Sequence, residues 1–193
     1  STFAIGRSGL RLVDRQPSHG VRPVSITISD DLVYVVNAGG ASASADAADN
    51  IAGFRLSRSG RLQAISDSTR PLSAVNSGPA QVSFNPEGDV LLVTEKTTHT
   101  LTTFSVGQDG RVISQQSTPS SGEVPFGFNF AGRAKVFVAN ASGSVSSYFI
   151  DETATPLVLA DAVPANATAV CWLVANKAKG HAVELVGKES VEG

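Results

Sequence analysis

An internal repeat constrains this chain more than any other feature of its sequence. Phe3, Phe54 and Phe104 are each followed six residues later by a glycine, in the segments FAIGRSGLRLV, FRLSRSGRLQA and FSVGQDGRVIS. Each segment predicts a strand, a tight turn at Ser-Gly or Asp-Gly, and a second strand. Tyr148 begins a fourth copy, in which Ala154 replaces the glycine. The anchors are 51, 50 and 44 residues apart, so the period is that of a supersecondary unit.

A second element alternates with the first. Its copies are RPVSITISDDLVYVVNAG, GPAQVSFNPEGDVLLVTEK and VPFGFNFAGRAKVFVANAS, which contain Pro23, Pro79 and Pro125, and a weaker copy runs from Thr168 to Leu185. Each copy again predicts strand, turn and strand, because apolar residues alternate along it and no helical period is present. One full repeat is therefore four short strands in about 45–50 residues.

Four antiparallel strands at this period predict a β-propeller blade, and the chain an all-β fold. A β-sandwich rarely repeats so regularly, and a β-helix has much shorter coils. We expect one domain over 1–193, with repeats of approximately 3–53, 54–103, 104–147 and 148–185. The chain begins in the second half of one blade and ends in the first half of another. It thus holds about four blade equivalents, as three complete repeats and two half blades.

Such a ring has to close, because an open ring leaves strand edges and an apolar blade face exposed. The two end halves could join into a four-bladed ring, or two chains could join end to end. The chain could also be one piece of a longer protein, which is the interpretation we favour. Ring closure by a second fragment or a second copy is therefore expected.

The composition excludes several classes of partner. Hydrophobic residues make up 41% and charged residues 17%, which is typical of a folded domain. The net charge of −2 and the absence of runs of like charge argue against nucleic acid or an anionic membrane as partner. No apolar run approaches the roughly 18 residues of a membrane span. The single cysteine, Cys171, excludes an internal disulfide framework.

Other motifs add little. The triplets at Asn140 and Asn166 match N-glycosylation sequons, which leans weakly toward a secreted or cell-surface protein. No His or Cys pair has zinc spacing, and the acidic loop 42–50 does not match a calcium loop. The sequence has neither a Gly-x-Ser-x-Gly elbow nor a phosphate loop.

Four segments carry a family resemblance: GPAQVSFNPEGDVLLVTEK, TPSSGEVPFGFNF, SVSSYFIDE and NATAVCWLV. Together they resemble the lactonase-type seven-bladed propellers, which include bacterial 6-phosphogluconolactonase and the fungal carboxymuconate-lactonizing enzyme. The resemblance implies that the chain is about half of a parent ring. It also implies a reaction that opens or forms a small anionic lactone, of the sugar-acid or muconate type, in the central funnel. No metal or other cofactor is implied.

Propeller geometry indicates where such a site would lie. The connection that enters each innermost strand and the loop that follows each second strand open on the same face of the ring. Asn37, Glu95 and Asn140 each end a predicted second strand, so we expect them at equivalent places near the ring axis. The funnel candidates are Arg22, Asn37, Gln81, Glu95, Lys96, His99, Glu123 and Asn140.

Lactone hydrolysis needs a base that activates water, donors for the developing oxyanion, and a cation for the acid group of the substrate. Glu95 matches a glutamate that family members carry at the end of this strand, which makes it the candidate base. His99 and His19 are secondary acid–base candidates, and Arg22 or Lys96 is expected to hold the anion. The remaining funnel candidates, Asn37, Gln81, Glu123 and Asn140, are expected to contact substrate.

One difference from the residues of the family supports a second hypothesis for the function. Family enzymes carry an Arg-His pair after the Gly-Pro that starts this strand, whereas this chain has Ala80-Gln81. Alanine removes a bidentate cation, and glutamine moves no proton at neutral pH. A Glu-Lys pair at a strand end is also often an ordinary solvated feature. The second hypothesis is therefore a non-catalytic binding propeller, secreted or at the cell surface, that binds a small carbohydrate-like ligand or a peptide across its open face.

Overall fold

The computed structural model describes residues 1–40, 48–165, 167, 169–176 and 181–184, and every regular element within them is a β-strand. The expected all-β class is confirmed, and the described residues include no helix that is long and apolar enough to cross a membrane. The strands are β1 (Thr2–Gly6), β2 (Gly9–Asp14), β3 (Pro23–Ser29), β4 (Leu32–Asn37), β5 (Asn50–Leu56), β6 (Leu62–Ala64), β7 (Arg70–Pro71), β8 (Pro79–Phe84), β9 (Val90–Glu95), β10 (Thr100–Val106), β11 (Val112–Pro119), β12 (Pro125–Phe130), β13 (Lys135–Asn140), β14 (Ser144–Ile150), β15 (Pro156–Pro164), β16 (Leu173–Asn176) and β17 (His181–Glu184).

The strands form three complete blades and two half blades, as the repeat predicts. The first blade is β3–β6, to which the short β7 adds by pairing with β5; the second is β8–β11 and the third is β12–β15. All pairs are antiparallel, and strands that are consecutive in the chain lie side by side. The hairpins β1–β2 and β16–β17 are separate two-stranded sheets at the two ends. They correspond to the outer pair of one blade and the inner pair of another.

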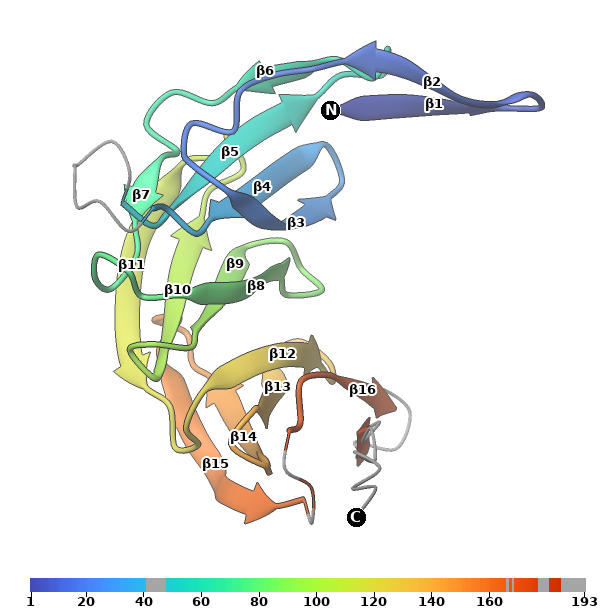
Figure 1. The fold of residues 1–193 in the computed structure, drawn as a ribbon. Helices are drawn as coiled ribbons and strands as arrows, with labels where there is room; N and C mark the ends of the chain where they lie inside the picture. The colour runs from blue at the N-terminus through green and yellow to red at the C-terminus, as the bar shows by residue number, and fades with distance from the viewer. Residues whose placement is uncertain (41–47, 166, 168, 177–180, 185–193) are drawn as a thin grey trace.

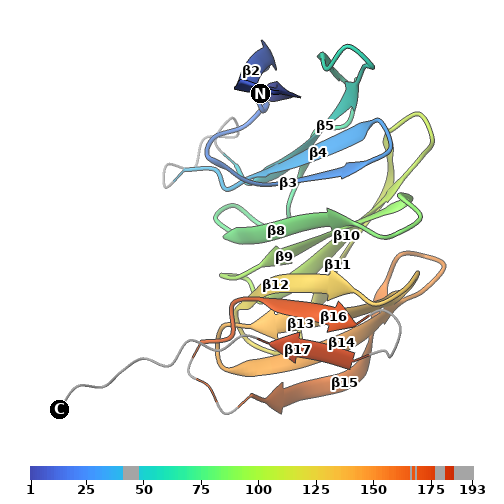
Figure 2. The ribbon, with the colours of Figure 1, turned by 90° about the vertical axis from the view of Figure 1, so that its right-hand side faces the viewer.

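The blades follow one another along a crescent (Figure 1). The innermost strands β3, β8, β12 and β16 lie on its concave side, and Figure 2 looks onto them with β9, β10 and β11 behind β8. A complete propeller has these strands around its central channel. The concave side is therefore the part of this chain that would face the channel.

The turn between the third and fourth strands explains the repeated glycine. In the second blade, Gly110 has a φ of 79° and its N–H donates to the carbonyl of Gly107 at 2.8 Å. In the third blade, Ala154 adopts the same left-handed conformation, with a φ of 61°, and donates to Asp151 at 3.0 Å. The Cβ of an L-residue costs about 1 kcal/mol in this conformation, so the turn is kept at a modest penalty.

The core lies between the blades. The face of the first blade that carries Tyr34 packs on the second blade, and the Tyr34 hydroxyl donates to the carbonyl of Gly110 at 2.6 Å. Burial raises the pKa of Tyr34 to about 12. The apolar layer between the first and second blades includes Tyr34, Val36, Ile51, Val82, Phe84, Leu91, Val93 and Phe104, and the layer between the second and third includes Leu92, Leu101, Phe128, Phe130, Val136, Val138 and Tyr148.

Candidate functional site

The start of each innermost strand and the end of each second strand meet at one face, which we call the loop face. It consists of the connections 18–22, 72–78 and 120–124 together with the loops after β4, β9 and β13. In the second blade, the Lys96 N–H donates to the carbonyl of Gly78 at 3.0 Å, and the same bond recurs in the other two blades. This contact fixes the loop face in the same way three times.

The residue before each innermost-strand proline has a left-handed backbone. The φ angles are 53° at Arg22, 69° at Gly78 and 56° at Val124. A positive φ is uncommon for a non-glycine residue and strained for a β-branched one such as valine. Such strain is held by the surrounding structure and concentrates at functional loops, so it marks the loop face as a candidate site.

Asn37, Glu95 and Asn140 occupy equivalent positions, as the last residues of β4, β9 and β13. All three side chains are fully buried in the blades. The Asn37 amide donates to the carbonyl of Ser18 at 3.0 Å and to the side chain of Asn50 at 2.8 Å. The repeat therefore predicts the place of these residues along the strands, while their amide and carboxylate groups bind protein atoms.

The Glu95 carboxylate is surrounded by hydroxyl donors. It accepts hydrogen bonds from the Ser73 hydroxyl, from the Thr98 hydroxyl at 3.2 Å and from the buried Thr102 hydroxyl, and a longer one from the Ser73 N–H at 3.4 Å. Buried carboxylates need such partners, because removal from water is costly. In this arrangement Glu95 ties the segment after β7 to β9 and β10.

Asn140 lies in a similar position with different partners. Its amide donates to the hydroxyls of Ser144 and Ser146, both at 3.1 Å. A Cβ on Gly122 would lie well inside 3.0 Å of this amide, so the glycine makes room for the asparagine. The Asn140 sequon is therefore closed to glycosylation in the folded chain, and Asn166 lies outside the described residues.

Gln81 binds the neighbouring blade with both ends of its amide. Its oxygen accepts from the Phe128 N–H at 2.9 Å, and its nitrogen donates to the Phe128 carbonyl at 3.2 Å. The pairing register shifts between Pro79 and Gln81, which is a bulge at the start of β8. Gln81 thus joins the innermost strands β8 and β12.

His99 makes a blade-to-blade contact. Its Nδ1 accepts a hydrogen bond from the Val124 N–H at 2.8 Å. Asp49 makes the same contact one blade earlier, where its carboxylate accepts from the Gly78 N–H at 2.9 Å. The neutral His99 ring therefore carries its proton on Nε2. His19, the other histidine candidate in the described structure, stacks on Phe54 with ring centroids 5.6 Å apart.

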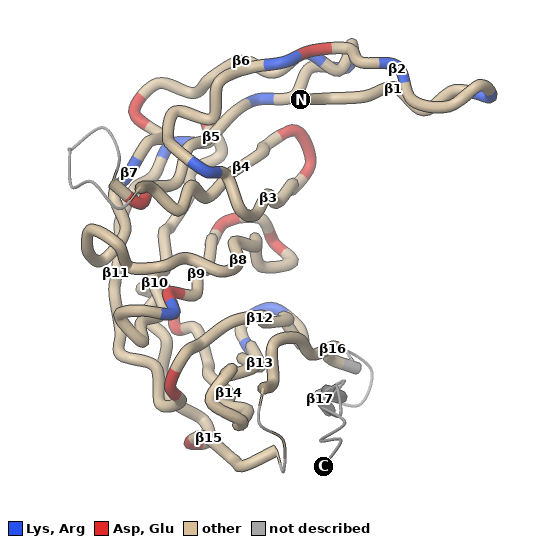
Figure 3. The backbone as a smooth tube through the Cα atoms, in the orientation of Figure 1, with Lys and Arg blue, Asp and Glu red and all other residues tan. Residues whose placement is uncertain are grey.

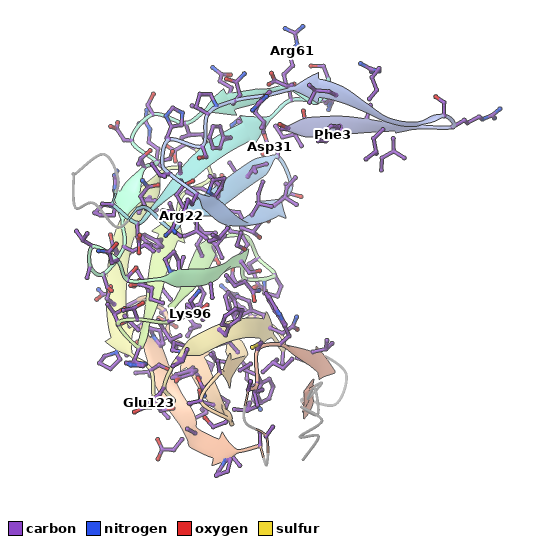
Figure 4. All side chains as sticks on the ribbon, in the orientation of Figure 1. Phe3, Arg22, Asp31, Arg61, Lys96 and Glu123 are labelled. Atoms are coloured by element: carbon purple, nitrogen blue, oxygen red, sulfur yellow. The ribbon has the colours of Figure 1, made fainter. Side chains whose placement is uncertain are left out.

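Two cations lie on the loop face. The exposed Arg22 donates to the carbonyls of Gly39 at 2.7 Å and Ala38 at 3.1 Å, so it holds the loop after its own β4. The half-buried Lys96 lies with its Nζ 3.5 Å from the Pro79 carbonyl and 5.0 Å from the centroid of the Phe126 ring. Figure 4 shows that Arg22, Lys96 and the exposed Glu123 follow one another along the crescent.

Lys96 belongs to a small cluster with two aromatic side chains. Phe126 and Trp172 meet edge to face with centroids 5.5 Å apart. A Cβ on Gly127 would lie 2.5 Å from the Trp172 ring, so the glycine leaves room for the indole. We call Lys96, Phe126 and Trp172 the lysine–aromatic cluster. It combines a cation with apolar ring faces at the concave end of the loop face.

The charges lie at the ends of the innermost strands. β3, β8 and β12 carry no Asp, Glu, Lys or Arg, whereas the loops and turns at both ends do (Figure 3). Across the described residues, no group of three or more His, Cys, Asp or Glu side chains is placed to hold a metal ion. The charged groups on the concave side are therefore confined to the loops and turns at the strand ends.

The model of one family matches residues 47–174, and its description is lactonase, 7-bladed beta-propeller. The chain belongs to this lactonase family. The match covers most of the described blades and agrees with the resemblance seen in the sequence. A search of curated proteins found no match.

Solved structures share the fold. A functionally unknown protein from Desulfotomaculum acetoxidans is 18% identical with a TM-score of 0.72, over 95% of this chain and 55% of that chain. The periplasmic gluconolactonase of Pseudomonas aeruginosa is 19% identical with a TM-score of 0.67, over 89% and 59%. A putative 6-phosphogluconolactonase from Bacteroides uniformis is 16% identical with a TM-score of 0.67, over 85% and 50%. This lactonase-family chain thus spans between 50 and 59% of those three chains.

Sequence reasoning missed part of the site in this lactonase-family chain. Phe126 and Trp172 were not among the candidates, although each lies in a copy of the second element. Their contact with each other is seen only in the structure. The contacts of Asp49 and His99 were also missed. Both lie five residues before a phenylalanine anchor, so alignment of the repeats would have found them. No pattern in the repeats indicates that Ser73 binds Glu95.

Proposed function

We propose that the lysine–aromatic cluster binds a small anionic sugar-acid lactone in a lactonase-type propeller. The observation that carries the proposal is Lys96, a half-buried cation over Phe126 at the loop face of a lactonase-family chain. The periplasmic gluconolactonase and the 6-phosphogluconolactonase among the similar structures suggest the substrate class. Nothing in the geometry favours a muconate over a sugar acid.

Lys96 has capacity left for an anion. An ammonium group carries three N–H donors, and the carbonyl of Pro79 takes one of them at 3.5 Å. Partial burial strengthens the attraction between the ammonium and a carboxylate or phosphate, because the local dielectric is lower than that of water. The faces of Phe126 and Trp172 would take the apolar side of a sugar ring.

His99 fits the role of an oxyanion donor better than that of a base. Since its Nδ1 accepts the Val124 N–H, its Nε2 holds a proton that it can donate to a developing negative charge. Removal of a proton from water at Nε2 would first require the loss of the bond to Val124. His99 would thus stabilise the tetrahedral intermediate of lactone hydrolysis.

Glu95 remains a hypothesis as the catalytic base. Its carboxylate accepts four hydrogen bonds from protein donors, so an attacking water reaches it only if Ser73 moves away. The variant Glu95→Gln separates the two roles. A catalytic base predicts a large loss of kcat in a chain of normal stability, whereas a structural tie predicts a loss of stability with little change in kcat per folded molecule.

Binding is tested with the only tryptophan as reporter. Titration of the 193-residue chain with gluconate and with 6-phosphogluconate should change Trp172 fluorescence in a saturable way, and neutral glucose should not. Lys96→Ala should weaken binding of the acids at least tenfold. Lys135→Ala is the matched control, because Lys135 lies equally 5.0 Å from a phenylalanine ring, that of Phe137, outside the cluster.

Catalysis is tested by the initial rate of glucono-δ-lactone and 6-phosphoglucono-δ-lactone hydrolysis above the uncatalysed rate. A rate that Lys96→Ala and His99→Ala both lower supports the lactonase proposal. Saturable binding without any rate above background would favour the second candidate, a non-catalytic binding propeller. That candidate draws support from Glu95 and Gln81, whose polar groups are engaged by protein atoms.

A further inference from the structure

Lys96 differs in charge from its counterparts in the two neighbouring blades. The residue after the second strand is Ala38 in the first blade and Ala141 in the third, whereas it is Lys96 in the second. The backbone bond from this residue to the one before the proline is nevertheless common to all three blades. The groups that fix this bond in the second blade therefore also fix the cation of the lysine–aromatic cluster.

Lys96 is joined to the part of the chain that enters β8. The Lys96 N–H donates to the carbonyl of Gly78 at 3.0 Å, and the next N–H, that of Thr97, donates to the carbonyl of Ser77 at 2.9 Å. The Lys96 ammonium lies 3.5 Å from the Pro79 carbonyl. A Cβ on Gly78 would lie 2.4 Å from the Thr97 hydroxyl, so the two parts of the chain pack tightly. A shift of the chain before β8 would therefore move Lys96 as well.

Asp49 of the first blade holds the same part of the chain. Its carboxylate oxygen Oδ2 accepts hydrogen bonds from the Gly78 N–H and from the Ser77 hydroxyl, both at 2.9 Å. Asp49 is 1% exposed, and its own carbonyl accepts the Leu72 N–H at 3.0 Å. Hydrogen bonds to a carboxylate are among the stronger ones in proteins. Asp49 therefore fixes Gly78, and Gly78 fixes Lys96.

The next junction between blades has the same contacts without a cation. There the His99 Nδ1 accepts the Val124 N–H, and the Val124 carbonyl accepts the Ala141 N–H at 2.9 Å. In both junctions a side chain of the preceding blade thus holds the residue before the proline, which in turn holds the loop after the second strand. Only the junction of Asp49 ends on a charged side chain, at Lys96.

We propose that Asp49 is a positioning residue, which holds Lys96 in place for the anionic group of the ligand. The proposal rests on the binding function proposed above for the lysine–aromatic cluster. Asp49 acts through its hydrogen bonds and not through its charge, because a negative charge would by itself repel an anion. Loss of the acceptor should free Gly78 and with it Lys96, and a less ordered ammonium binds an anion more weakly.

Asparagine can replace Asp49 as the acceptor. The second carboxylate oxygen, Oδ1, has no hydrogen-bond partner in the described part of the chain. The NH2 group of an asparagine can therefore take the place of Oδ1 without breaking a bond, while its carbonyl oxygen accepts from Gly78 and Ser77. Asp49→Asn thus keeps the acceptor and removes the charge, whereas Asp49→Ala removes both.

Amide hydrogen exchange, followed by NMR without any ligand, tests whether Asp49 positions Lys96. In Asp49→Ala the Lys96 N–H should exchange at least tenfold faster relative to the Ala141 N–H, and in Asp49→Asn the ratio should stay unchanged. Ala141 is the matched control, because its equivalent bond belongs to the next junction. An unchanged ratio in Asp49→Ala would overturn the proposal.

Titration with 6-phosphogluconate, read by Trp172 fluorescence, tests whether this position matters for binding. Asp49→Ala should weaken binding at least fivefold, while Asp49→Asn should not weaken it. In a Lys96→Ala background Asp49→Ala should cause no further loss, because Asp49 acts only through Lys96. Equal losses in the two backgrounds would contradict the positioning role.

Asp151→Ala is the control for a general loss of stability in this titration. The Asp151 carboxylate also accepts backbone N–H bonds, from Thr153 and Thr155 at 2.8 Å, but in the turn between β14 and β15. This variant should bind 6-phosphogluconate as the unchanged chain does.

The positioning role and the binding function fail in different ways. If the unchanged chain binds no acid, the binding function fails, and the exchange rate at Lys96 still decides whether Asp49 positions it. If the unchanged chain binds 6-phosphogluconate and Asp49→Ala binds it equally well, the positioning role fails and the binding function stands.

Discussion

The end of the second strand is built in two different ways in neighbouring blades. In the first and third blades an asparagine, Asn37 or Asn140, packs against a glycine three residues before the innermost-strand proline. In the second blade Glu95 replaces the asparagine, and Asn76, with a φ of 58°, replaces the glycine. We call each such residue pair an inner corner. One backbone bond, from the residue after the second strand to the residue before the proline, recurs at all three corners.

The difference lies in how the buried polar atoms are satisfied. The side-chain oxygens of Asn37 and Asn140 have no hydrogen-bond partner among the described residues, whereas both oxygens of Glu95 have partners. A carboxylate costs more to bury than an amide, so the second blade supplies donors from outside the corner, at Ser73 and Thr98. The comparison teaches that the repeat preserves this one backbone bond, while the chemistry of the corner depends on neighbouring segments.

The largest effect should come from the carboxylate itself. Glu95→Ala leaves the donors at Ser73, Thr98 and the buried Thr102 without their acceptor, so we expect a loss of about 3 kcal/mol in the free energy of unfolding. Asn140→Ala should cost about 1 kcal/mol, because its two serine partners can pair elsewhere. Urea unfolding measures both, and equal costs would break the distinction between the two kinds of corner.

The second largest effect is expected at the glycine of the inner corner. In Gly122→Ala the new Cβ meets the buried Asn140 amide, which has no room to move, so we expect a loss of about 2 kcal/mol. Gly40→Ala is the matched control, since nothing lies within 4 Å of a Cβ at that position. If both variants were equally stable in urea, the packing of asparagine against glycine would not define the corner.

Replacement of the second-blade corner residues by those of the other two blades tests the comparison directly. Glu95→Asn alone should destabilise the second blade, because an asparagine meets Asn76 where its counterparts meet glycine. Addition of Asn76→Gly should recover about 1 kcal/mol, since glycine also relieves the positive φ. A double-mutant cycle from urea unfolding gives this coupling, and strict additivity of the two changes would contradict it.

The smallest effect is expected at Tyr34, where the first blade contacts the second. Burial raises the pKa of Tyr34 from its usual 10 to about 12, so the folded state favours the neutral phenol. The stabilisation that comes from the raised pKa of Tyr34 is complete below pH 10. It is lost as the pH rises from 10 towards 12, because this phenol ionises at lower pH in the unfolded chain than in the folded one. Tyr34→Phe should cost about 1 kcal/mol or less at pH 8 through the lost bond to Gly110.

Tyr34→Phe should also reduce the steepness with which the free energy of unfolding falls above pH 10. Urea unfolding of the unchanged chain and of Tyr34→Phe at pH 8 and pH 11 measures the slope. An unchanged alkaline slope in Tyr34→Phe would mean that another group causes it.

Much of the fold followed from local patterns. The alternation of apolar residues and the turn glycines predicted three complete blades and two half blades, and the structure shows them. The equivalence of Asn37, Glu95 and Asn140 was also predicted, because position in a repeat is a property of the sequence. What the repeat could not predict is the partner of Gln81, which is the backbone of Phe128 on the neighbouring blade.

The sequence by itself determined the blade, the order of its strands and the place of each candidate along them, because strand alternation and tight turns depend on residues close in the chain. Only the tertiary structure decided what those candidates touch. Ser73 reaches Glu95 from 22 residues away, and Phe126 and Trp172 meet from different blades. Such contacts arise when neighbouring blades pack, and packing depends on the shapes of both partners.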